Sequence, residues 1–111
     1  MNKKIIDWAN QEHNLKDVGT SYYKMGTGVI LPTHGDTYKA YRRIFNCNLN
    51  NCYRIIIFLE DWQSGHYFEI DNTPISAYPA GTWVKWVANT THMAANLGTT
   101  NRYTLQITGH K

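Results

Sequence analysis

The chain has no long apolar run and no block of like charge. No segment approaches the length of a transmembrane helix, and the N-terminal residues carry no apolar stretch of signal-peptide length. We therefore expect a soluble, cytoplasmic protein with no membrane partner. The 11 basic and 8 acidic residues give a formal charge of +3 and are spread along the chain. This dispersion does not favour nucleic acid as a partner, although it leaves acidic partners open.

Cysteine is scarce, and repeats, linkers and low-complexity segments are missing. Cys47 and Cys52 flank the short segment 48–51, and in a reducing compartment we expect both to be free thiols. A disulfide across this turn is the alternative. The length of 111 residues predicts a single domain over 1–111 with a core of modest size.

Aromatic and β-branched residues dominate what remains. Residues 3 to about 14 place apolar side chains among polar ones with helical spacing, which predicts one short N-terminal helix. Beyond Gly19, short apolar segments alternate with turn residues, and eight Tyr and four Trp suit a β-rich core. We predict strands at 21–25, 28–32, 40–47, 53–59, 66–70, 74–78, 82–87, 92–96 and 102–108.

Segment 53–59 has apolar side chains at odd and at even positions, so both faces of a strand formed by it are apolar. This predicts a central strand covered on both faces. Turns are expected at Asp71-Asn72 and at Ala80-Gly81. The sequence thus favours a mainly all-β sandwich or jelly-roll barrel, with a β core over about 20–109.

Three side chains have the chemistry of a metal site. His34 and Asp36 lie two residues apart on an extended segment, so one ion can meet both, and Gly35 removes steric obstruction between them. His92 opens a later strand whose small neighbours leave room for a ligand. Two imidazoles and one carboxylate are the protein ligands of a non-haem Fe(II) site with open positions. The plainer alternatives are an exposed loop at 34–36 and a core histidine at His92.

Arg102 and Thr104 share one face of the strand 102–108, and the other face is apolar. If that polar face is solvated, the segment is an ordinary half-buried strand. If Arg102 points inward, its burial demands an anionic partner, because an unpaired buried charge costs several kcal/mol (about 3–5). An inward Arg102 and Thr104 would together grip a carboxylate.

These residues carry a family resemblance. The motifs His34-Gly-Asp36, His92 and Arg102-Tyr-Thr104 resemble those of Fe(II)/2-oxoglutarate-dependent oxygenases, and residues 31–109 resemble their double-stranded β-helix (jelly-roll, cupin-like) core. Residues 79–86 resemble the Gly-led strand before the distal histidine. The segment from Leu31 to Arg43 is similar to small, including phage-encoded, aspartyl/asparaginyl β-hydroxylase-like members, and a prolyl-hydroxylase-like member is the other option.

The resemblance implies that Fe(II) binds His34, Asp36 and His92, and that Arg102 and Thr104 hold the far carboxylate of 2-oxoglutarate. O2 would complete the cofactor set, and the reaction would hydroxylate a C–H bond with formation of succinate and CO2. The resemblance also implies that Arg43 is a second contact to 2-oxoglutarate. Aspartyl/asparaginyl β-hydroxylases lack the metal carboxylate that Asp36 supplies, so their substrate is not carried over.

The substrate is expected at an open mouth lined by loops 34–41 and 60–66. Tyr38 and Trp62 are the candidate substrate contacts, and a peptide or protein side chain is favoured over a small metabolite or nucleic acid. His66 is expected in the core or at the surface, and His13 and His110 have no assigned role. The rival hypotheses are a cupin-like metal-binding or scaffold domain and an oxygenase fold that has lost its substrate.

Overall fold

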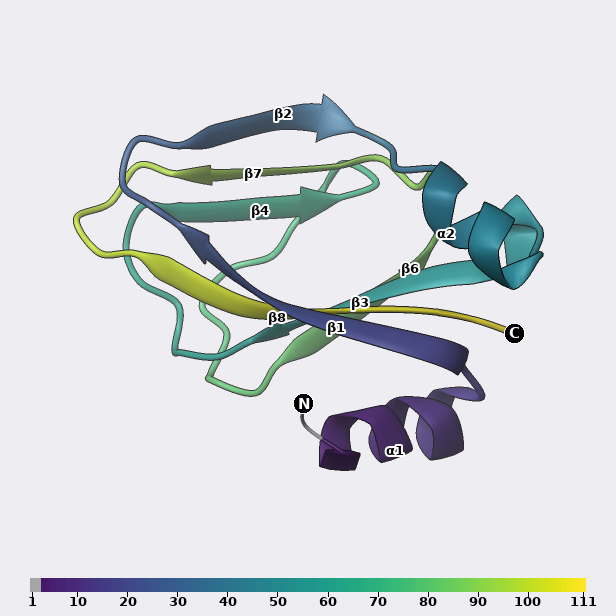
Figure 1. Ribbon diagram of the computed structural model, residues 1–111. Coiled ribbons are helices and arrows are strands. Elements are labelled where there is room, and N and C mark those ends of the chain that lie inside the picture. The colour runs from purple at the N-terminus through teal and green to yellow at the C-terminus, as the bar shows by residue number, and fades with distance from the viewer. Residues whose placement is uncertain (1–2) are drawn as a thin grey trace.

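Two four-stranded antiparallel sheets face each other in the computed structural model, which describes residues 3–111 (Figure 1). The strand order is β1-β8-β3-β6 in the first sheet and β2-β7-β4-β5 in the second. The elements are α1 (Lys3–His13), β1 (Lys16–Met25), β2 (Ile30–His34), α2 (Lys39–Phe45), the 3₁₀ turn η1 (Leu49–Asn51), β3 (Cys52–Phe58), β4 (His66–Ile70), β5 (Thr73–Pro74), β6 (Trp83–Val87), β7 (His92–Asn96) and β8 (Arg102–His110).

The main core lies between the sheets. Ile56 and Phe58 of β3 point into it, and Phe68 and Ala94 meet them from the second sheet. The ring of Phe58 stacks on Tyr78 and makes an edge contact with Phe68. Because side chains alternate along a strand, the residues of β3 between these inward-facing positions point to the opposite face of the sheet.

That opposite face of β3 is covered by helix α1, which lies against the outside of the first sheet (Figure 1). Ile55 of β3 and Ile107 of β8 pack there with Ala9 and Leu15, and all four are fully buried. The prediction of a central strand covered on both faces is therefore confirmed, and so is the N-terminal helix. No helix within residues 3–111 is long and apolar enough to cross a bilayer.

The predicted strand at 40–47 is wrong, because this segment forms helix α2 instead. Its residues do not alternate, and Tyr41 and Phe45 stand one turn apart with ring centroids 4.8 Å apart. Asn46 ends the helix in the left-handed region at φ 50°, and its N–H donates to the carbonyl of Arg42. The structure thus has a second helix beside the single one expected.

The predicted strand at 74–78 shrinks to the two-residue strand β5. Asp71 and Asn72 form the expected turn, both with positive φ, and this turn pairs β5 with β4. The last backbone hydrogen bond to β4 is donated by the Ile75 N–H to the Phe68 carbonyl, and Ala77 has a φ of 53° that an extended strand does not allow.

Candidate metal centre and its cavity

The register of β2 against β7 sets the geometry of the candidate metal centre. Leu31 pairs with Ala94, but His34 pairs with His92, so β2 contains one extra residue between these two pairs. Regular pairing would place Thr33 opposite His92 and turn His34 to the outside, since neighbouring side chains alternate. The bulge therefore brings His34 to the same face as His92. Pro32 is tolerated within it because β2 is an edge strand of its sheet.

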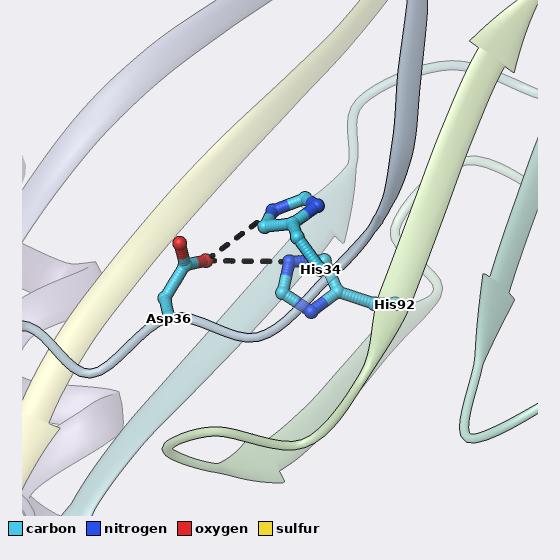
Figure 2. Close-up of side chains that lie close together, drawn as sticks. All are labelled: His34, Asp36 and His92. Atoms are coloured by element: carbon cyan, nitrogen blue, oxygen red, sulfur yellow. Dashed lines mark ion pairs between the residues drawn. The ribbon is translucent and has the colours of Figure 1, made fainter.

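Asp36 completes the group from the loop that follows β2. Its Oδ2 lies 3.6 Å from His34 Nε2 and 3.3 Å from His92 Nε2. Dashed lines mark these two pairs in Figure 2. One ligand atom from each of the three residues lies within 4.8 Å of the others. His92 is buried, whereas His34 and Asp36 are partly exposed. The structure thus brings together the three residues that the sequence nominates as metal ligands.

Backbone carbonyls orient both imidazoles. His34 Nδ1 lies 2.7 Å from the carbonyl oxygen of Pro32, and His92 Nδ1 lies 3.0 Å from that of Thr90. A carbonyl oxygen only accepts, so each Nδ1 carries the hydrogen, and in the neutral ring Nε2 presents its lone pair. Burial lowers the pKa of His92, which favours this neutral form. Two imidazole lone pairs and a carboxylate oxygen then converge, which is the arrangement a divalent cation requires.

A cavity of about 160 Å³ lies between the sheets at this group, with room for about five water molecules at ~30 Å³ each. The three candidate ligands form one part of its wall, and Arg102 forms another. Phe68 and Ile56 supply apolar wall from the two sheets. The candidate metal ligands and the arginine therefore face one shared cavity.

Arg102 is only 5% exposed and has no charged partner among residues 3–111. Among residues 3–111, none hydrogen-bonds its Nε or Nη1, and no carboxylate lies within ion-pair distance. Its guanidinium lies over the rings of Phe58 and Phe68, and burial lowers the pKa of Arg102. Thr104, two residues along the same face of β8, has a buried hydroxyl without a partner within this part of the chain. Such groups are costly to bury alone, so the site is built for an acceptor.

Comparison with known proteins identifies the fold alone. No family model matches the sequence, and no curated protein matches it significantly. A cupin protein from Bacteroides fragilis superposes with a TM-score of 0.58 at 16% identity, covering 91% of this chain and 72% of that one. A predicted oxalate decarboxylase from Thermotoga maritima superposes with a TM-score of 0.59 at 14% identity, covering 93% and 74%. An uncharacterised conserved protein from Klebsiella pneumoniae, described as having a double-stranded β-helix domain, superposes with a TM-score of 0.57 at 11% identity. The match covers 85% of this chain and 68% of that one.

The fold is a double-stranded β-helix. The fold expected from the sequence resemblance is therefore confirmed. Identities of 11–16% carry no substrate or activity to this chain, because one fold hosts many functions.

Other residues nominated by the sequence lie elsewhere in the double-stranded β-helix. Arg43, which the resemblance implies as a contact to the acid, is exposed on α2 and does not line the cavity. Trp62 packs against the core and donates its indole N–H to the carbonyl of His66. His66 is buried, and its Nε2 lies 3.0 Å from the carbonyl oxygen of Thr100. Tyr38 borders a groove beside the cavity rather than the cavity itself.

Arg54 lines the cavity, and the sequence interpretation missed it. It belongs to β3, whose alternation places residues 54, 56 and 58 on the inner face. Arg54 is the one charged residue among the inward-facing positions of β3, which are otherwise apolar. That contrast is the signal by which the sequence could have revealed Arg54.

Proposed function

We propose that this double-stranded β-helix is an Fe(II)- and 2-oxoglutarate-dependent dioxygenase. The observation that carries the proposal is the buried, unpaired Arg102 in the same cavity as the His34, Asp36 and His92 group. A barrel that only holds a metal has no need of a buried arginine aimed into its cavity. An enzyme that positions an organic acid beside a metal does.

The donor set fits the metal. Two neutral imidazoles and one carboxylate leave coordination positions free, and these suit an Fe(II) that must also bind an acid and O2. The Nδ1 hydrogen bonds to Pro32 and Thr90 hold both rings in the orientation that directs Nε2 to the ion. His34, Asp36 and His92 would therefore hold the metal.

The acid site fits 2-oxoglutarate. Arg102 would form a two-pronged hydrogen bond with the carboxylate far from the metal, and the Thr104 hydroxyl would donate to the same group. The apolar wall at Phe58 and Phe68 excludes water from this ion pair and strengthens it. When bound together, Fe(II), 2-oxoglutarate and O2 would supply conversion of the acid to succinate and CO2, coupled to hydroxylation of a substrate C–H bond. The protein's part is to orient the acid and exclude water.

The test is a calorimetric titration of the Mn(II)-loaded protein with 2-oxoglutarate, followed by an assay of succinate formation with Fe(II). We expect binding in the wild type and in Arg43→Ala, which removes an exposed arginine of α2, and at least tenfold weaker binding in Arg102→Ala. Arg102→Lys should restore only part of the affinity, because an ammonium lacks the planar fork.

Metal binding without binding of the acid would instead support the cupin-like metal-binding or scaffold domain. Equal affinity of wild type and Arg102→Ala would remove the main argument for an oxygenase. For the primary substrate we propose a peptide or protein side chain, with a small molecule as the second candidate.

A further inference from the structure

A groove of about 470 Å³ opens beside the metal cavity and shares Arg54 and Gln106 with it. Residues 19–21 of β1 form one wall, and residues 38–41 at the start of α2 form the other. Arg54, Gln106 and Thr108 form its floor on the inner face of the first sheet. A molecule in this groove would therefore lie next to the candidate metal centre, with Arg54 at the junction.

The groove is positively charged. Its lining contains two cations, Arg54 and Lys39, and no carboxylate. Arg54 donates from Nε to Thr108 Oγ1 at 3.1 Å and from Nη1 to Gln106 Oε1 at 2.7 Å. Both acceptors are neutral, and within residues 3–111 no carboxylate pairs with Arg54. The charge is held in a fixed orientation and is not neutralised.

Aromatic side chains shape the second wall. The guanidinium of Arg54 lies 4.8 Å from the ring centroid of Tyr38. The Tyr41 hydroxyl donates to the carbonyl of Asp17 at 2.9 Å, which joins the start of α2 to β1. This wall offers flat apolar surface to the body of an organic substrate, while the floor offers one fixed cation.

We propose that Arg54 binds a carboxylate of the primary substrate, so that the enzyme uses two arginines for two different acids. Arg102 would hold 2-oxoglutarate from one side of the candidate metal centre, and Arg54 would select a carboxylate-bearing substrate from the groove. A carboxylate is favoured over a phosphate because Lys39 is the only other cation of the lining, and a phosphate of about −2 charge asks for more donors. This inference rests on the proposed function, because the carboxylate bound by Arg54 is taken to belong to the substrate that the dioxygenase hydroxylates.

The experiment follows backbone amide and Arg54 Nε–H chemical shifts of Zn(II)-loaded protein saturated with 2-oxoglutarate. The probes are three capped amino acids: N-acetylglutamate N-methylamide, its glutamine isostere and the corresponding phosphoserine compound. We expect the carboxylate probe to shift Arg54 Nε–H and the signals of 38–41 and 106–108, with at least tenfold higher affinity than the amide.

Arg54→Met should abolish the preference for the carboxylate, and Arg54→Lys should keep part of it. Arg43→Met, which changes an exposed arginine of α2, is the matched control and should keep all of it. The amide spectrum of each variant reports whether it is folded, and Arg54→Lys serves as the second test if Arg54→Met does not fold.

Equal binding of acid and amide, tighter binding of the phosphate probe, or an unchanged preference in folded Arg54→Met would each overturn the assignment. So would a probe that competes with 2-oxoglutarate, since it would then occupy the Arg102 site. Failure of the proposed function is a separate result, because it is seen as a lack of 2-oxoglutarate binding in the wild type before any probe is added.

Discussion

His34 on β2 lies directly opposite His92 on β7, one residue out of step with the pairing of Leu31 and Ala94. Their ring centroids are 4.3 Å apart, and Asp36 Oδ2 approaches the Nε2 atom of each. The bulge in β2 thus converts two distant histidines into neighbouring candidate ligands. Substitutions that disturb this local geometry should lower metal affinity without unfolding the sheets.

Gly35→Ala should weaken metal binding about tenfold or more, the size of effect seen when the support of a ligand is changed. A Cβ at this position would lie 2.7 Å from Asn89 Oδ1 and 2.9 Å from the Asn89 carbonyl oxygen. Asn89 N–H also donates to the carbonyl of Asp36, so the clash would displace Asp36 from the histidines. Titration with Mn(II) or Co(II) measures the change.

Gly26→Ala is the matched control for that substitution, since its Cβ would meet nothing closer than 3.9 Å. Wild-type affinity in Gly35→Ala would show that the loop from His34 to Asp36 tolerates displacement.

Arg102→Met should raise the free energy of unfolding of the ligand-free protein by about 1–3 kcal/mol, or leave it unchanged, while removing 2-oxoglutarate binding. The reason is that Arg102 is buried without an acid partner, and methionine fills a similar apolar volume. Urea unfolding in a buffer free of carboxylates and phosphate measures the stability. A loss of more than about 2 kcal/mol would mean that the guanidinium has a stabilising partner in the free protein.

Asn96→Ala should destabilise the protein by about 3 kcal/mol. The fully buried Asn96 amide donates to the carbonyls of Met25 and Thr100, and its oxygen accepts from the Gly98 N–H. Removing the side chain takes a hydrogen-bond partner from three backbone groups, of which the Met25 carbonyl belongs to a buried residue and the Gly98 N–H to a partly buried one. Thermal or urea unfolding measures the loss. The exposed Asn101→Ala should change stability by no more than about 0.5 kcal/mol, and an equal effect of the two substitutions would contradict this role of Asn96.

Cys52 should react slowly with iodoacetamide in the folded protein. Burial, followed by the contact with Cys47, raises the pKa of Cys52, and the burial persists when Cys47 is replaced, so the reactive thiolate is scarce at pH 8. Intact-mass analysis of Cys47→Ser over time isolates the rate at Cys52. The same variant in urea should be alkylated far faster, and equal rates in the two conditions would show that Cys52 is accessible.

The sequence by itself determined the β-rich fold class, and it nominated His34, Asp36, His92 and Arg102, which the structure brings to one cavity. Strand β3 could be predicted as central because its apolar side chains occupy both parities, and one element on each face must cover them. Alternation along β8 placed Arg102 and Thr104 on one face, and the structure buries both. These inferences depend on periodicity, which is a local property of the chain.

Only the tertiary structure decided how the candidate site is assembled. Simple alternation from Leu31 would turn His34 to the outside of the sheet. The extra residue in β2 turns it to the inside, and this residue is seen only in the pairing of β2 with β7. Helix α2 replaced a predicted strand because the Tyr41–Phe45 contact and the left-handed Asn46 favour a helix there. The second cation at the cavity, beside Arg102, is Arg54 of β3 and not Arg43 of α2. Which side chains point into the space between the sheets depends on strand pairing, and strand pairing is set by contacts between residues far apart in the chain.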